Sequence, residues 1–193
     1  VENDTLLAEY TVNYKKTHSQ TLLPMLDEIS NMTELDLSTI DAIAVAGGPG
    51  SFTGLRIGSA TAKGLGLALE KPLISIPTTA AIAYNIWDTN KFVCPIMDAR
   101  RNQVYTGVYC YTDHRLDTVW EQDTMSIEAL AEGLNCLDHE VIFLGDGVAV
   151  YREKLEALLT IPFSFAPAHV NRQRAAAVGA LAEVYYKEGK IQT

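Results

Sequence analysis

The stretch Ala42–Leu69, AIAVAGGPGSFTGLRIGSATAKGLGLAL, decides the fold. It begins with an uninterrupted apolar run, Ala42–Ala46, which is typical of a strand buried on both faces. The turn Gly47–Gly50 then breaks the strand, because glycine permits positive φ angles and proline fixes its own φ. Ser51 or Thr53 can cap the helix that follows. The stretch therefore predicts a strand, a tight turn and a helix N-terminus.

A turn of this kind can hold an anion, because free backbone amides and the helix dipole converge there. The known anion-binding patterns do not fit, however. A P-loop ends in Gly-Lys-Ser/Thr, and no glycine of this turn is followed by that motif. A dinucleotide-binding fingerprint that starts at Gly48 needs a glycine where Thr53 stands. The pattern therefore favours a tight connection over a phosphate cradle.

Small residues recur every four positions along the predicted helix. One row comprises Gly54, Gly58, Ala62 and Gly66, and a second row comprises Ala60, Gly64 and Ala68. Each glycine costs about 1 kcal/mol relative to alanine inside a helix, so several glycines require a compensating gain. Close packing against another backbone supplies that gain. The spacing leaves open whether this neighbour lies within the chain or in a partner.

Alternation, apolar stripes and capping residues predict the remaining elements. Strands are expected at Leu6–Tyr14, Leu73–Ile76, Phe92–Met97, Gln103–Tyr111, Leu116–Glu121 and Val141–Leu144. Helices are expected from a Thr17–Gln20 capping box through Ile29 with a bend at Pro24, and at Thr78–Trp87, Ser126–Leu134, Ala149–Leu159 and Arg172–Tyr186. The order of strand, glycine turn and helix thus occurs twice, the second time around Gly145-Asp146-Gly147.

This duplication predicts an α/β fold of two lobes, as in the actin-like and sugar-kinase-like ATPases (the ASKHA, ribonuclease H-like fold). A turn-rich link near Asn90 predicts lobes at residues 1–90 and 91–193, with the last helix a candidate to pack back on the first lobe. Enzymes of this fold bind a nucleotide between the lobes with a carboxylate and a phosphate turn in the first strand. That strand does not precede Val1, so the residues predict no intact nucleotide site.

Composition restricts the function further. The chain has 193 residues and a formal net charge of −9, which argues against nucleic-acid binding by this chain alone because such surfaces are basic. Cys94, Cys110 and Cys136 are odd in number and widely spaced, as expected of reduced thiols in a cytoplasmic protein. We expect no signal peptide and no membrane association, because no run of about 18 apolar residues occurs.

No catalytic or metal-binding constellation is predicted. A helix-borne zinc pair needs two histidines four residues apart, yet Leu22 stands four after His18, and the other three histidines are isolated. Ser51 lies in GPGSFTG and not in a GxSxG motif. Asp146, between two glycines, is interpreted as a turn residue in preference to a cation or nucleotide ligand.

Arg100 and Arg101 follow a strand end and are the best small cationic spot of the second lobe. Arginine binds carboxylate and phosphate groups with paired hydrogen bonds. An exposed pair beside a turn is slightly favoured over such a binding role.

At Ala46–Gly58, AGGPGSFTGLRIG, the sequence resembles the signature of the TsaB (YeaZ) family, the dimerisation subunit of the bacterial complex that makes threonylcarbamoyladenosine in tRNA. Three further stretches agree in order, at His18–Pro24, Asp98–Tyr105 and Leu144–Gly147. The resemblance extends from about Glu9 to Gly179. It implies a non-catalytic scaffold that dimerises with the related catalytic subunit TsaD and supports transfer of a threonylcarbamoyl group to adenosine 37 of tRNA.

The same resemblance implies further partners. The ATPase TsaE and the intermediate-forming enzyme TsaC belong to the pathway, and the chain alone is expected to form a homodimer. Contact with tRNA is expected only through the complex. No cofactor is expected for the chain itself, while ATP or ADP is a candidate ligand of the complex. The partner interface is expected at His18, Leu22, Leu26, Gly54, Gly58, Ala62 and Gly66.

The sequence departs from the family at both ends. Family members open with a strand that contains an Asp-Thr-Ser type turn and usually close with a Tyr-Leu-Arg type segment, and neither is present. We expect both ends to have been trimmed.

Two other functions remain open. The first is an independent ATP-dependent phosphotransferase of the actin-like fold. The second is a glycoprotease-type metallopeptidase, after an older name for relatives, which the histidine spacing disfavours. Substrate-dependent ATP turnover by the chain alone, at about one per second or more, would favour the phosphotransferase over the scaffold.

Overall fold

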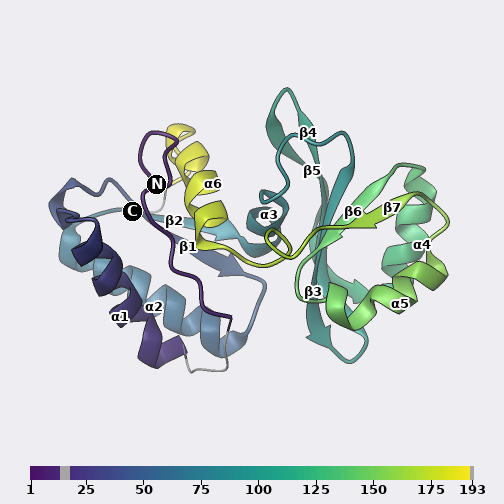
Figure 1. The fold of residues 1–193 in the computed structure, drawn as a ribbon, viewed down its shortest axis with the longest axis horizontal. Coiled ribbons are helices and arrows are strands. Elements are labelled where there is room, and N and C mark those ends of the chain that lie inside the picture. Colours follow the sequence, from purple (N-terminus) through teal and green to yellow (C-terminus); the bar gives the residue numbers. More distant parts are fainter. Residues whose placement is uncertain (14–17, 192–193) are drawn as a thin grey trace. The chain divides into compact units, whose positions relative to one another are not determined.

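The computed structural model describes residues 1–13 and 18–191, and only the backbone of residues 18–20 (Figure 1). Contacts within the chain group it into two units, one formed by Val1–Ile76 together with the segment that starts at Arg174, the other by Pro77–Gln173. The expected boundary near Asn90 thus falls inside the second unit. The first unit is discontinuous in sequence, because its last helix comes after the second unit.

The first unit is built around a two-stranded sheet of β1 (Ile43–Gly48) and β2 (Leu73–Pro77). Its helices are α1 (His18–Met32), the short 3-10 helix η1 (Leu37–Thr39), α2 (Phe52–Leu69) and α6 (Ala175–Lys187). Helices α2 and α6 both contact β1 and lie on opposite sides of the two strands (Figure 1). Helix α1 packs against α2.

The sequence predicts the junction between β1 and α2 correctly. Ser51 is the N-cap of α2, and its side-chain oxygen accepts a hydrogen bond from the Gly54 backbone N–H at 3.4 Å. The helix ends at Glu70, which has a left-handed conformation and donates its backbone N–H to the Gly66 carbonyl. The expected burial of β1 on both faces is wrong, because Ile43–Ala46 is only half-buried. Only β2 pairs with β1 among the described residues.

The strand expected at Leu6–Tyr14 is absent from its described part, which ends at residue 13; Tyr14 and the Thr17–Gln20 capping box lie outside the fully described residues. A strand needs a neighbouring strand for its backbone hydrogen bonds, and the sheet of this unit offers none to this segment. The segment is held by the side chain of Glu9 instead. Its carboxylate accepts hydrogen bonds from the Arg174 guanidinium and, at 2.9 Å, from the Ala176 backbone N–H at the start of α6.

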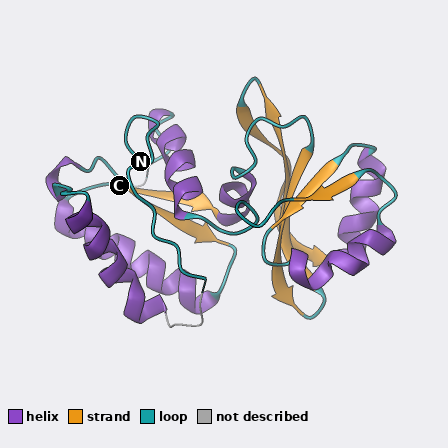
Figure 2. Cartoon of the chain, in the orientation of Figure 1, coloured by secondary structure: helices purple, strands orange, loops and turns teal. Residues whose placement is uncertain are grey.

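The second unit contains a five-stranded sheet in the order β5-β4-β3-β6-β7. Strands β3 (Phe92–Arg100), β4 (Gln103–Thr112) and β5 (Arg115–Ser126) form an antiparallel meander. Strands β6 (Val141–Leu144) and β7 (Phe163–Phe165) continue the sheet in parallel from β3. Helices α4 (Ile127–Leu137) and α5 (Val148–Leu158) cover one face, and α3 (Thr78–Ala83) lies on the other (Figure 2).

The core of this unit lies between the sheet and its two longer helices. Its fully buried side chains include Ile96, Leu130, Leu134, Phe143 and Leu155. The prediction of β6 is confirmed at both ends, and Ser126 caps α4 as expected, accepting a hydrogen bond from the Ala129 N–H at 3.1 Å. The helix expected at Thr78–Trp87 ends at Ala83, and β7 has no counterpart in the prediction. No helix in the described residues combines the length and the apolar character needed to cross a membrane.

The contact between Glu9 and α6 gives a first testable prediction. Burial raises the pKa of Glu9, but the hydrogen bonds from Arg174 and the Ala176 N–H outweigh it, so this pKa lies below its ordinary value. We expect Glu9→Gln to lower the free energy of unfolding by about 1–3 kcal/mol at neutral pH, because Arg174 loses its carboxylate. Chemical denaturation of both proteins measures the difference.

The pH dependence of that difference separates charge from shape. A carboxylate with a lowered folded-state pKa stabilises the fold above its unfolded pKa of about 4.3, and the stabilisation is lost as the pH falls through the folded value. The gap between wild type and Glu9→Gln should therefore shrink below about pH 5. A gap that is constant from neutral to acidic pH would contradict an ionic contact.

Candidate functional site

The turn between β1 and α2 is held by close backbone contacts. A Cβ added at Gly47 would lie 2.1 Å from the Ser75 Oγ of the neighbouring strand, and Gly48 has a φ of 112°. Gly48 therefore favours glycine by its conformation, and any larger residue at Gly47 would displace the Ser75 hydroxyl. The bond between Gly48 and Pro49 is cis. These contacts account for the glycines by packing and conformation, as the tight-connection interpretation expected.

The first row of small residues on α2 faces its own sheet. A Cβ at Gly58 would contact Val45 of β1 at 3.6 Å, and one at Gly66 would approach Leu73 of β2 to 2.9 Å. Ala62, between them, is only 5% exposed. For these three residues the structure shows packing within the chain, which the spacing had left open. At the N-terminal end of this row, a Cβ added at Gly54 would lie 3.5 Å from the Cβ of the capping Ser51.

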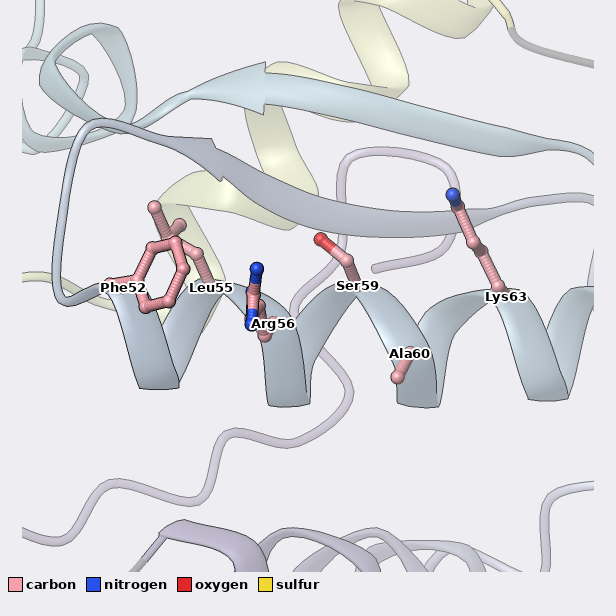
Figure 3. Close-up of a pocket in the computed structure, with 6 residues that line it drawn as sticks. All are labelled: Phe52, Leu55, Arg56, Ser59, Ala60 and Lys63. Carbon is pink, nitrogen blue, oxygen red and sulfur yellow. The ribbon is translucent and has the colours of Figure 1, made fainter.

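The second row lies on the outer side of the same helix. Ala60 and Ala68 are exposed, and a Cβ at Gly64 would meet no atom within 4 Å. Ala60 points away from the two strands (Figure 3). With Leu67, which is 84% exposed, these residues give α2 an outer face of small and apolar side chains that the described residues do not cover, with Arg56 and Lys63 on the same side.

Neighbouring α1 adds to this apolar surface. Leu23 and Leu26 are 57% and 38% exposed, while Leu22 is half-buried. The side chain of His18 lies outside the described residues. The interface expected from the sequence stays a prediction for the seven residues as a set. Among them, Leu26 is exposed, Leu22, Gly54 and Gly58 are half-buried, and Ala62 and Gly66 are buried.

An open groove runs along α2 at its N-terminal half. It is lined by Phe52, Leu55, Arg56, Ser59, Ala60 and Lys63, all on this one helix (Figure 3). The Arg56 guanidinium lies 4.0 Å from the centre of the Phe52 ring, and Phe52 itself is 69% exposed. A groove with a single wall lacks the enclosure typical of small-molecule sites. Its apolar floor and two cations suit contact with another protein.

The second glycine turn, Gly145-Asp146-Gly147, is held against β3. A Cβ at Gly145 would lie 2.2 Å from the Ile96 carbonyl oxygen, and the Gly147 N–H donates to that oxygen at 3.0 Å. Gly145 also has a φ of 103°. One carboxylate oxygen of Asp146 is buried without a hydrogen-bond partner among the described residues. The turn is thus required by the fold, and Asp146 keeps one acceptor unused.

Titratable residues do not gather into a metal site in the part of the chain that the structure describes. His114 pairs with Asp88 at 2.7 Å, and His139 bonds the Asn90 carbonyl at 2.8 Å. Burial raises the pKa of Cys94 to about 12, against the opposing hydrogen bond to Thr106, so its thiol is protonated at neutral pH and is a poor nucleophile.

Comparison with known proteins identifies relatives of this chain by family model and by sequence identity. The family model for TsaD, tRNA N6-adenosine threonylcarbamoyltransferase, matches residues 5–192. The tRNA threonylcarbamoyladenosine biosynthesis protein TsaB of Bacillus subtilis is 34% identical over 159 residues, which cover 82% of this chain and 69% of the relative. The TsaB of Escherichia coli is 33% identical over 138 residues, 68% of this chain and 58% of that protein. The chain thus spans about three-fifths to two-thirds of the length of these relatives.

A solved structure described as YeaZ from Pseudomonas aeruginosa superposes with a TM-score of 0.77 and 25% identity, over 91% of this chain and 80% of that one. The expected actin-like, ribonuclease H-like α/β fold is therefore confirmed. The matching family model and the TsaB relatives are named for the same tRNA modification. This shared name is the starting point for assigning a role to the exposed face of α2.

The inner face of α2 gives the second prediction. Ala62→Leu adds bulk between the helix and its sheet, where overpacking typically costs about 1–3 kcal/mol. We expect a clear fall in the melting temperature of the monomer, measured by thermal unfolding at low protein concentration. Ala60→Leu, on the outer face of the same helix, is the matched control and should melt like wild type. Equal melting of all three proteins would contradict the packing described here.

Proposed function

We propose that the chain takes part in tRNA threonylcarbamoyladenosine biosynthesis as a non-catalytic scaffold. The chain belongs to the TsaB (YeaZ) family, and the proposal follows from this membership. In this role it binds a TsaD-type subunit, which transfers the threonylcarbamoyl group to adenosine 37 of tRNA. The observation that carries the proposal is the exposed apolar surface of α1 and α2. Among the described residues, this exposed surface is more prominent than any grouping of potentially catalytic side chains.

The chemistry of this surface favours a helical protein partner. Phe52, Ala60, Gly64 and Leu67 share one side of α2, because their spacing follows the helical repeat. The exposed side chains of Phe52 and Leu67 enlarge the apolar area on this side of the helix, and contiguous exposed apolar area is typical of protein interaction sites. Ala60 and Gly64 carry little bulk, so a second helix can approach closely between the larger side chains. We therefore propose a partner interface on the outer face of α2, with the exposed Leu23 and Leu26 of the neighbouring α1 as further candidates.

The two cations beside this surface would set the orientation of the partner. Arg56 and Lys63 are both exposed and lie within one to two helical turns of Ala60. Carboxylates on the partner helix would pair with them at the rim, where charges contribute more to the association rate and register than to affinity. A second copy of this chain presents the same apolar face, so a homodimer is expected when the TsaD-type subunit is absent.

The proposal extends to the rest of the pathway. A TsaE-type ATPase joins the assembled pair, ATP or ADP binds only in that assembly, and tRNA is held through the complex. The chain carries a net charge of −9, so we expect no sub-micromolar tRNA binding by the chain alone. We expect this work to take place in the cytoplasm.

Gly64→Leu tests the interface directly. The new side chain meets open space in the monomer and leucine is favoured over glycine inside a helix by roughly 1 kcal/mol, so the melting temperature should equal that of wild type or lie a few degrees above it. Association with a TsaD-type subunit should weaken by roughly ten- to a hundredfold, since 1.4 kcal/mol of overpacking is a factor of ten. Isothermal titration measures the affinity for the TsaD-type subunit, and sedimentation of the chain alone measures the affinity of self-association. Unchanged affinities would place the interface elsewhere.

A reconstituted reaction tests the function. A mixture of tRNA, ATP, a TsaC-type enzyme with its substrates, a TsaE-type ATPase and a TsaD-type subunit should yield modified adenosine only when this chain is added. The chain alone should neither turn over ATP at about one per second nor cleave proteins. Full modification without the chain would contradict the scaffold, and substrate-dependent ATP turnover by the isolated chain would favour a phosphotransferase.

A further inference from the structure

The hairpin between β3 and β4 has an unfavourable sequence for its backbone. Arg100 pairs with Gln103 across it, so the turn itself is Arg101-Asn102. The φ angles of Arg100, Arg101 and Asn102 are 68°, 53° and 62°. Two-residue turns with positive φ at both positions strongly prefer Asn-Gly or Asp-Gly, because a Cβ is disfavoured in this region. Asn102 fits that preference, and the two arginines do not.

The next hairpin also needs positive φ angles in its turn, and there the turn residues are of types that adopt this conformation more readily. Between β4 and β5, Thr112 pairs with Arg115, and the turn residues Asp113 and His114 have φ angles of 49° and 63°. Asp and His adopt this region several times more often than most residues. Arginine at two consecutive left-handed positions therefore points to a use of its side chain, since such strain is typically retained at functional sites.

Hydrogen bonds to the neighbouring strand end and helices hold this turn in place. Asp98 accepts from the Arg100 backbone N–H at 2.9 Å and from the Tyr151 hydroxyl of α5 at 3.2 Å. Asn102 donates to Glu128 of α4 at 2.9 Å. Lys154 of α5 donates to the same Glu128 at 3.2 Å and also to Asn102. The turn is fixed at both sides before any ligand arrives.

The two arginine side chains are left available by these contacts. The Arg100 side chain is 86% exposed, and its one ion pair is with Asp98 at 3.5 Å. Arg101 is exposed, and its side chain makes no hydrogen bond or ion pair with any described residue. The nearby carboxylates of Asp98 and Glu128 already accept hydrogen bonds within the turn. The pair is thus a preorganised cationic tip on an otherwise acidic chain.

We propose that Arg100 and Arg101 bind the phosphodiester backbone of the tRNA when the complex is assembled. This inference rests on the proposed function. Guanidinium groups bind phosphates with paired hydrogen bonds, and most protein contacts to nucleic acids that position without reading sequence are of this kind. An exposed tip suits a continuous chain of phosphates better than a small ligand, which needs enclosure. Because the net charge of the chain is −9, the contact adds to binding supplied by the partner.

The test is equilibrium binding of fluorescently labelled tRNA to the full chain in complex with a TsaD-type subunit, over a range of salt concentrations. The Arg100→Ala/Arg101→Ala double variant should bind roughly tenfold more weakly. The slope of log affinity against log salt should fall by about 1–2, one for each phosphate that an arginine no longer neutralises. Arg172→Ala removes an exposed arginine elsewhere in the same unit and should change neither quantity.

Arg101→Gly separates the side chain from the backbone. Glycine relieves the left-handed conformation, so this variant should melt at or above the temperature of wild type while binding tRNA as weakly as Arg101→Ala. A marked fall in melting temperature would show that the arginine stabilises the turn, and would overturn the inference. Unchanged tRNA affinity and salt slope in the double variant would overturn it as well.

The readout distinguishes this inference from the proposed function. Equilibrium binding of tRNA does not depend on the modification reaction. A complex that fails to modify tRNA therefore still shows whether Arg100 and Arg101 contribute to tRNA affinity. The same titration of the chain alone, at about 20 mM salt where screening is weak, needs no partner. A double variant that binds tRNA normally but loses the TsaD-type subunit would identify the tip as a contact to an acidic protein segment, and would overturn the proposal.

Discussion

The close approach of α2 to the two strands of its unit is the constraint on which the first unit depends. A Cβ added at Gly66 would lie 2.9 Å from Leu73 and 3.0 Å from the Lys71 carbonyl oxygen, one at Gly58 would contact Val45 at 3.6 Å, and Ala62 between them is buried. On this face the helix therefore covers β1 and β2 with residues that carry little or no side chain. This requirement explains why a sequence accepts glycines in mid-helix at about 1 kcal/mol each. It also uses up one face of α2, and so decides which face remains for a partner.

The two rows of small residues on α2 thus have different uses. The row that contains Ala62 is internal, and the row that contains Gly64 is open. Under the function proposed above, stability and recognition would be separated within one helix, because substitutions on the inner side would change unfolding and those on the outer side would change association. The second unit makes a similar division at its β3–β4 hairpin. There the side chains of Asp98 and Asn102 hold the turn, while those of Arg100 and Arg101 are left exposed.

Sequence patterns predicted those parts whose order is set by nearby residues. The junction of β1, Gly47–Gly50 and α2, the limits of β6 and the cap at Ser126 all follow from local propensity and hydrogen bonding. The strand expected at Leu6 failed because alternation alone supplies no pairing partner. Periodicity located both rows of small residues but could not assign their directions, since both satisfy the same spacing. The left-handed conformation of Arg100 and Arg101 gave no signal, because turn preferences predict glycine or asparagine at such positions and not arginine.

The contact between Glu9 and the start of α6 joins residues 165 or more positions apart, with the whole second unit between them in sequence. During synthesis the second unit is complete before Arg174 has left the ribosome, whereas the first unit must wait for it. The second unit, with its own core and continuous chain, is therefore free to fold first. Until α6 arrives, the side of β1 and β2 that it covers has no protein neighbour. The order of translation therefore makes the first unit the last to complete its native contacts.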